Sequence, residues 1–161
     1  MATLRIAAVG APGAGKSALL AALAANARRP LATSEAASLG ALGDTVHDLV
    51  LECVDVRRAI GRGAQDGGGR GGRGSYTGAF VRVFTKMDDT DGSMFDGDWD
   101  NVDPDDEDKV MWRNEYRSDI AFELKFPVTG GADASFAVSA RTEWRLADLL
   151  MYVEALRPRA H

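Results

Sequence analysis

The chain has a single cysteine and no apolar run near the about 20 residues that a membrane-spanning helix needs. Cys53 has no partner for an internal disulfide, and its apolar neighbours indicate a buried, unreactive thiol. No basic segment or cleavage site precedes the first apolar run, so nothing indicates export. Position 2 is not glycine and the last residues contain no cysteine, so the usual lipid anchors are missing. We therefore expect an intracellular protein without a membrane anchor of its own.

Positive charge is absent from one long stretch. Between Asp88 and Asp108 there are eleven Asp and Glu residues and no Lys or Arg. The formal net charge of the whole chain is −5, so the rest of the chain carries +6. We expect an acidic insertion, 88–108, that faces water or a basic partner. Residues 96–107 fit a calcium-loop spacing in part, but Asn101 replaces the turn glycine, so calcium binding is the weaker alternative.

Apolar residues are nearly missing from a second stretch, 61–78, which contains nine glycines and three arginines. Such a segment buries too little surface to offset the entropy lost on ordering, so it predicts a flexible loop. An arginine–glycine tract can contact RNA, but this one is short and only Tyr76 offers a ring for stacking. Nucleic acid is therefore not the partner that we expect.

The strongest motif is a glycine-rich loop near the N-terminus. An apolar run, 4–9, is followed by Gly10, Ala11, Pro12, Gly13, Ala14, Gly15, Lys16 and Ser17, and an Ala/Leu-rich helical pattern continues from Ala18. A strand, a glycine loop and a helix in this order are typical of a phosphate-binding loop. The backbone N–H groups of this loop and of Ala18 would face a polyphosphate, Lys16 would contact the β- and γ-phosphates, and Ser17 would bind Mg²⁺.

The remaining pattern predicts a single α/β domain, 1–161, with a mostly parallel sheet. Strands are expected at 4–9, 46–55, 79–84, 122–129 and 136–138, and helices from the glycine loop to residue 29, from about 103, and at 146–156. Residues 31–43 are small and polar and predict a loop. Asp55 would lie at the carboxyl end of its strand, where ligands of open α/β sheets bind.

Together these features resemble the Ras superfamily of small GTPases, including its Rab-like members. Thr33 lies 22 residues before Asp55, which matches the family spacing between the threonine that binds Mg²⁺ and the aspartate that holds it through water. The resemblance implies a three-layer P-loop G-domain with about six strands. It also implies GTP or GDP as ligand and Mg²⁺ at Ser17, Thr33 and Asp55.

Two further stretches carry the resemblance. Ser139, Ala140 and Arg141 are similar to the family's Ser-Ala-Lys, whose backbone contacts guanine, and Trp112 lies about where Rab-like members have a tryptophan. The family's base-recognition motif, Asn-Lys-x-Asp, corresponds here to the segment 130–133, of which Asp133 alone would bind guanine. Only five residues separate Asp133 from Ser139, too few for a crossover helix. Either one or two of the family's helices are missing, or the strand assigned before Asp133 is shifted.

Other departures concern hydrolysis. The family's Asp-x-x-Gly becomes Asp55-Val56-Arg57-Arg58, and its water-positioning glutamine falls on Ala59. Phosphoryl transfer depends on positioning the water and stabilising the charge, so slow or absent hydrolysis is expected.

Three function classes follow. The first is an atypical small GTP-binding protein that acts on protein partners. The second is a pseudo-GTPase that serves as a scaffold or as a subunit of a large assembly. The third is a small nucleotide or metabolite kinase, because the glycine loop also resembles that of adenylate kinase. The sequence after Ser17 and the absence of a substrate-binding arginine lid argue against the kinase.

Overall fold

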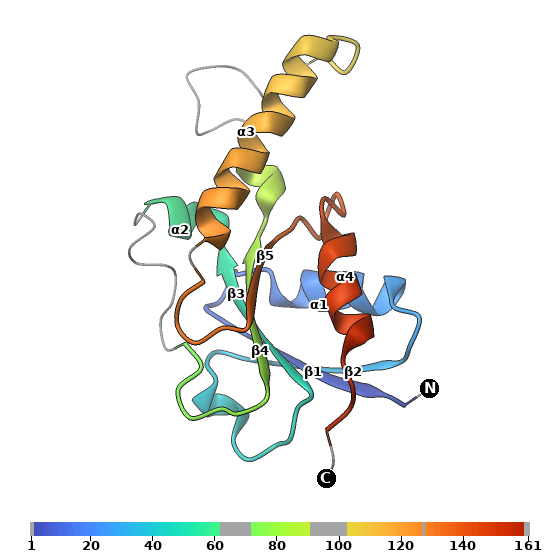
Figure 1. Ribbon diagram of the computed structural model, residues 1–161, viewed down its shortest axis with the longest axis vertical. Helices are drawn as coiled ribbons and strands as arrows, with labels where there is room; N and C mark the ends of the chain where they lie inside the picture. Colours follow the sequence, from blue (N-terminus) through green and yellow to red (C-terminus); the bar gives the residue numbers. More distant parts are fainter. Residues whose placement is uncertain (1, 62–71, 91–102, 127, 160–161) are drawn as a thin grey trace.

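A computed structural model describes residues 2–61, 72–90, 103–126 and 128–159 of the protein, and its described strands form one parallel sheet in the order β2-β1-β3-β4-β5 (Figure 1). The strands are β1 (Leu4–Val9), β2 (Leu31–Ala36), β3 (Leu49–Asp55), β4 (Ala79–Thr85) and β5 (Ala134–Ala137). The helices are α1 (Lys16–Asn26), α2 (Val56–Gly61), α3 (Glu107–Lys125) and α4 (Leu146–Ala155), with short 3-10 helices η1 (Gly40–Leu42) and η2 (Met87–Thr90). The predicted α/β class is confirmed.

Helices pack on one face of the sheet, and both helices and loops pack on the other. Leucines of α1 and α4 pack on one face, against alternate residues of β1, β3 and β4 such as Leu51 and Val83. On the opposite face, α2 and α3 cover the carboxyl half, around Val54 and Phe84. The amino half of that face is covered by loops, with Leu39, Leu42 and Tyr76 packed on Val9 and Phe80. The carboxyl ends of all five strands therefore meet at one edge, with helices on both sides.

Two predicted elements were wrong. The expected loop 31–43 contains β2, which pairs with β1 from Leu4↔Leu31 to Val9↔Ala36. The expected strand 122–129 does not exist in the described residues, since 122–125 belong to α3. The short spacing between Asp133 and Ser139 comes from the shifted strand assignment, because the crossover helix α3 lies before Asp133 and connects β4 to β5. Between β2 and β3, the described residues contain the 3-10 helix η1 and no α-helix.

Other predictions fall partly outside the described residues. The expected flexible loop 61–78 and acidic insertion 88–108 include 62–71 and 91–102, which lie outside them, as does most of the calcium-loop spacing. In the described part of the glycine-rich stretch, the hydroxyl of Tyr76 donates to the carbonyl oxygen of His47 at 3.1 Å.

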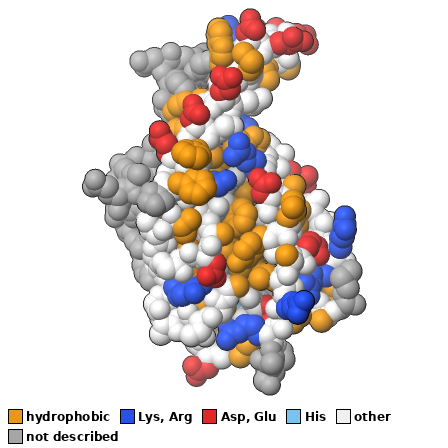
Figure 2. Space-filling model, in the orientation of Figure 1, with side chains coloured by type: hydrophobic (Ala, Val, Ile, Leu, Met, Phe, Trp, Pro, Cys, Tyr) orange, Lys and Arg blue, Asp and Glu red, His pale blue; other side chains and the backbone are white. Residues whose placement is uncertain are grey.

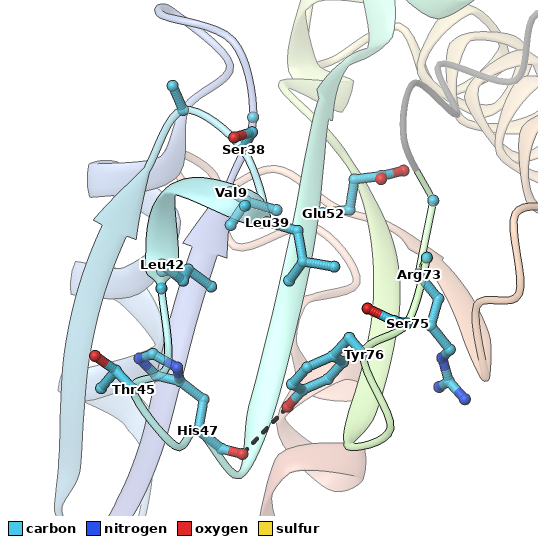
Figure 3. A pocket seen from close by; sticks show the side chains of 16 residues that line it. Val9, Ser38, Leu39, Leu42, Thr45, His47, Glu52, Arg73, Ser75 and Tyr76 are labelled. Carbon is cyan, nitrogen blue, oxygen red and sulfur yellow. Dashed lines mark hydrogen bonds between the residues drawn. The ribbon is translucent and has the colours of Figure 1, made fainter.

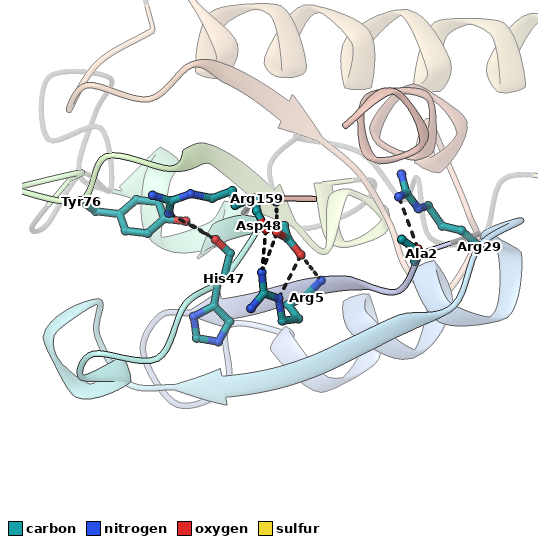
Figure 4. Close-up of polar contacts among 7 residues, drawn as sticks. All are labelled: Ala2, Arg5, Arg29, His47, Asp48, Tyr76 and Arg159. Atoms are coloured by element: carbon teal, nitrogen blue, oxygen red, sulfur yellow. Dashed lines mark hydrogen bonds and ion pairs between the residues drawn. The ribbon is translucent and has the colours of Figure 1, made fainter. Parts of the chain in front are cut away.

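The C-terminal segment is tied to the amino end of the sheet (Figure 4). The carboxylate of Asp48 accepts hydrogen bonds from the backbone N–H of Arg5 at 2.7 Å and of Arg159 at 2.6 Å. The Arg5 guanidinium lies 3.0 Å from the same carboxylate, whose side chain is fully buried. These contacts join β1, the start of β3 and the end of the chain at the edge opposite the glycine loop.

Helix α3 projects beyond the body of the molecule (Figure 1). Only Arg117 and Ala121 of this helix are buried. Its first turn carries Glu107 and Asp108, and acidic side chains gather at this end of the molecule in Figure 2. Within the described residues, neither α3 nor any other helix has the length and apolar character needed to cross a membrane.

Candidate nucleotide site

The predicted strand, glycine loop and helix are present at the carboxyl edge of the sheet. β1 ends at Val9 and α1 begins at Lys16, so the loop 10–15 connects a buried strand to a helix N-terminus. Gly10 has a φ of 152°, and a Cβ there would lie 2.5 Å from the carbonyl oxygen of Cys53. Gly15 has a φ of 83°, which a side chain would strain. The loop thus requires glycine at both ends to pass close to β3 and enter the helix.

Lys16 and Ser17 both contact the end of β2. The Lys16 ammonium donates to the carbonyl oxygen of Gly10 at 2.5 Å and to that of Ala36 at 3.4 Å. The Ser17 hydroxyl lies 2.9 and 2.8 Å from the two carboxylate oxygens of Glu35. The sequence analysis missed Glu35, because the segment that carries it was taken for a loop. An acidic residue at the end of the stretch Leu-Ala-Thr-Ser-Glu-Ala was the available signal.

Among the described residues, neither of the two other predicted metal residues forms a hydrogen bond with the Ser17 hydroxyl. Thr33 lies inside β2, paired with Ile6, and is two residues from Glu35. Asp55 does end β3 at the loop edge, but its carboxylate forms an ion pair with Lys86 at 3.3 Å and accepts from the backbone N–H of Arg57 at 2.9 Å. Among the described residues no group of three or more His, Cys, Asp or Glu side chains could enclose a metal ion.

Two side chains at the end of β4 hold the glycine loop from the other side. The Thr85 hydroxyl donates to the carbonyl oxygen of Ala14 at 2.6 Å, and the Lys86 ammonium donates to that of Gly13 at 2.6 Å. Lys86 has a φ of 62°, a conformation that is uncommon without glycine and that surrounding contacts must maintain. Its ion pair with Asp55 and its bond to the loop supply those contacts.

Asp88 lies beside these residues and is held by the loop after β5. One carboxylate oxygen accepts from the Ser139 hydroxyl at 2.8 Å, and the other lies 3.0 Å from Nε of Arg141. Ser139 is fully buried, whereas the Arg141 side chain is 81% exposed. A pocket of about 250 Å³ opens between Gly15, Ala18, Thr85, Lys86, Asp88, Ala140 and Arg141. The structure therefore brings the predicted residues Ala18 and 139–141 to the glycine loop.

The placement predicted for Asp133 was wrong. Its backbone N–H donates to the carbonyl oxygen of Phe80 at 2.7 Å, and its carboxylate accepts from the Phe80 N–H at 3.0 Å. Phe80 lies near the start of β4, so Asp133 is at the amino edge of the parallel sheet, opposite the glycine loop.

A better match to the family pattern Asn-Lys-x-Asp follows β4 directly, and sequence reasoning missed it. The segment reads Thr85-Lys86-Met87-Asp88 and matches the pattern at the lysine and the aspartate. Trp112 also lies after this motif, in α3, and not before it.

Two more pockets lie along β3. One, of about 510 Å³, is bounded by loop residues 10–14, by 37–38, by 52–55 and by Arg58. The other, of about 490 Å³, lies under the segment that contains η1, where Glu52, His47 and Tyr76 contribute to its wall (Figure 3). Both include Gly10, Ala37, Ser38 and Glu52.

Burial raises the pKa of two groups that line the 510 Å³ pocket, Glu52 and Cys53. Burial raises the pKa of the Glu52 carboxyl, against the opposing effect of the Arg82 guanidinium at 2.7 Å. Burial also raises the pKa of the Cys53 thiol to about 12. The predicted burial of Cys53 is confirmed, and a thiol with a raised pKa is a poor nucleophile at neutral pH.

No protein-family model and no curated protein matches the sequence, but solved structures match its fold. Translation elongation factor SelB from Methanococcus maripaludis, in its apo form, is 13% identical and superposes with a TM-score of 0.53 over 99% of this chain. Sup35 complexed with GMPPNP is 17% identical, with a TM-score of 0.50 over 96% of the chain. The FeoB G-domain from Methanococcus jannaschii is 16% identical, with a TM-score of 0.50 over 95% of the chain.

The chain spans 35% of SelB and 45% of Sup35, but 96% of the FeoB G-domain. At these identities the likeness concerns the fold alone. It agrees with the parallel sheet, the glycine loop after β1 and the helices on both faces. The chain has the fold of a P-loop GTPase G-domain.

Proposed function

We propose that this protein binds a guanine nucleotide, GTP or GDP, with Mg²⁺ at the carboxyl edge of the sheet. The observation that carries the proposal is the position of Asp88 at the wall of the small pocket beside Gly15 and Ala18. A carboxylate there can accept hydrogen bonds from N1 and N2 of guanine, whereas adenine offers no N1–H donor at that edge. Lys86 and Thr85 hold the same wall against the glycine loop.

The residues near Ser17 fit a magnesium ion. A hydroxyl and a carboxylate supply the hard oxygen ligands that Mg²⁺ prefers, and they lie within 2.9 Å of each other. A site with so few protein ligands suits Mg²⁺, which is usually bound by one or two carboxylates together with phosphates and waters. We assign Ser17 and Glu35 to this role, in place of Thr33 and Asp55.

Hydrolysis by this site is proposed to be slow or absent. Ala59, where the sequence resemblance places the water-positioning glutamine, belongs to α2, is 3% exposed and packs into the core beside Phe84. The described residues around the 510 Å³ pocket include no glutamine or histidine, and its two carboxylates are already in ion pairs. A water molecule would therefore lack the partner that phosphoryl transfer requires.

A protein that binds a nucleotide and cleaves it poorly acts through what it contacts. We propose protein partners, with a large assembly as one setting. Support comes from apolar side chains that α3 leaves exposed, including Met111, Trp112 and Phe122.

The experiment is to identify the nucleotide released from purified protein and to titrate the protein with fluorescent GDP, with and without Mg²⁺. Lys16→Ala is the control, because it removes the charge expected to contact phosphate; circular dichroism checks that the fold survives the loss of the Lys16 hydrogen bonds to Gly10 and Ala36. Bound GDP or GTP that depends on Lys16 would support the proposal. A site that stays empty with added Mg²⁺ and GTP would favour the scaffold, and phosphoryl transfer from ATP to a small acceptor would favour a kinase.

A further inference from the structure

The pocket of about 250 Å³ beside Asp88, proposed above for the guanine base, is called the base pocket here. The pocket of about 510 Å³ lies on the other side of the glycine loop. The base pocket includes Gly15 and Ala18, whereas this pocket includes residues 10–14, which form the first half of the loop. A nucleotide with its base beside Asp88 and its phosphates along the loop N–H groups has its phosphate end directed toward residues 10–14. The larger pocket is therefore where a third phosphate would extend.

Three charged side chains line this pocket, and only the two carboxylates have an ion-pair partner among the described residues. Glu52 is paired with Arg82 at 2.7 Å, and Asp55 is paired with Lys86 at 3.3 Å. Both carboxylates in the wall thus have their own cation. Arg58 is the only cation among the described residues that line the pocket, and within that part of the chain it forms no ion pair. A site with two neutralised carboxylates and one remaining guanidinium favours an anion.

Helix α2 fixes the position of Arg58. Val56 and Ala59 are buried against Phe84 and Met87, so this side of the short helix is anchored in the core. Arg58 itself is exposed and lies on the pocket side. Its planar guanidinium can donate two parallel hydrogen bonds to phosphate oxygens.

We infer that Arg58 binds the terminal phosphate of a nucleoside triphosphate and makes the protein prefer GTP over GDP. The inference rests on the proposed guanine-nucleotide function and names the residue that reads the third phosphate.

The test compares binding of fluorescent GDP and fluorescent GMPPNP, with Mg²⁺, to the wild type, Arg58→Ala and Arg57→Ala. Arg57 is the matched control, because it removes the same charge from the same helix but does not line the pocket. Arg58→Ala is expected to lower GMPPNP affinity about 10-fold or more, the effect of one charge-assisted hydrogen bond, and to change GDP affinity less than about twofold. Arg58→Lys, which keeps the charge without the planar fork, should restore part of the loss.

The outcomes separate this inference from the proposed function. If the wild type binds both nucleotides and Arg58→Ala weakens both equally or neither, the role of Arg58 is wrong while nucleotide binding stands. If Arg57→Ala lowers the GMPPNP preference as much as Arg58→Ala, the effect is general electrostatics and the inference is wrong. If the wild type binds neither nucleotide, the proposed function fails and this inference fails with it.

Discussion

Two aspartates at opposite edges of the sheet distinguish the base site proposed from the structure from the one expected from sequence. Asp88→Ala should lower GDP affinity about 100-fold, because two hydrogen bonds to a charged group are lost in a partly enclosed pocket. Asp133→Ala should leave GDP affinity within about twofold of the wild type, since its partners are Arg73 and the backbone of Phe80. Fluorescent GDP titration measures both, and the reverse ranking would contradict the placement of the base.

In the proposed site, Arg141 competes with the guanine base for the Asp88 carboxylate. Its guanidinium lies 3.0 Å from Asp88 but is 81% exposed, so the ion pair is weak and screened by salt. Arg141→Ala should raise GDP affinity about two- to fivefold at low ionic strength, and the gain should fade as salt is added. Association and dissociation rates measured over a salt series check this. A loss of affinity in Arg141→Ala would show instead that this side chain helps to hold the nucleotide.

At the residue scale, the glycine loop was predictable and the base motif was missed for an identifiable reason. All four fixed positions of the loop stand in one short stretch. Thr85-Lys86-Met87-Asp88 follows directly on the predicted strand 79–84, which is the signal that could have found it. The motif was overlooked because Asp88 was assigned to the acidic insertion 88–108, which it begins. Asp133 was predicted instead because it follows an apolar segment that was taken for a strand, and residues 122–125 of that segment belong to α3.

At the element scale, buried strands were predictable and the exposed edge strand was not. β3 and β4 are apolar and β-branched, as strands covered on both faces must be. β2 reads Leu-Ala-Thr-Ser-Glu-Ala and has no buried residue, so neither alternation nor hydrophobicity marks it. Only pairing with β1 makes it a strand, and pairing cannot be read from the segment alone. Because β2 was not predicted, its residue Glu35, the carboxylate proposed for Mg²⁺, was not predicted as a site residue either.

The tie between β1, β3 and the C-terminal segment predicts a pH dependence of stability. Burial tends to raise the pKa of the Asp48 carboxyl, but hydrogen bonds from Arg5 and Arg159 outweigh it and hold that pKa below 3.8. A carboxyl with a lowered pKa stabilises the fold above its unfolded pKa, and this contribution is lost as the pH falls through the folded pKa. Asp48→Asn should therefore destabilise the protein by about 2 kcal/mol near neutral pH.

Urea unfolding over a pH series measures this effect. The difference between wild type and Asp48→Asn should shrink as the pH falls below the ordinary aspartate pKa, where the unfolded chain binds the proton, and on through the lowered pKa of folded Asp48. The exposed Asp44 supplies the control, and Asp44→Asn should change little at any pH. A difference for Asp48→Asn that stays constant with pH would show that the carboxylate charge does not contribute.

At the scale of the whole molecule, nucleotide binding should appear as thermal stability. A ligand that binds only the folded state at about 100 times its Kd adds about 2.7 kcal/mol, which corresponds to a Tm increase of about 5–10 °C for a chain of this size. GDP with Mg²⁺ should produce this shift in the wild type, and removing Mg²⁺ with EDTA should reduce it. The same additions to Lys16→Ala should leave Tm nearly unchanged, and an equal shift there would mean that GDP binds elsewhere.

The hydrogen bonds of Asp48 with Arg5 and Arg159 have a practical consequence for experiments on partners. Leu4 and Arg159 both lie at the amino edge of the sheet, and the chain ends lie near each other in Figure 1. A fluorophore, affinity tag or surface linker joined to either terminus would leave from that edge. Protein immobilised in this way presents the glycine loop and helix α3 to solution, so a captured binding protein can be assayed with and without nucleotide on the same sample.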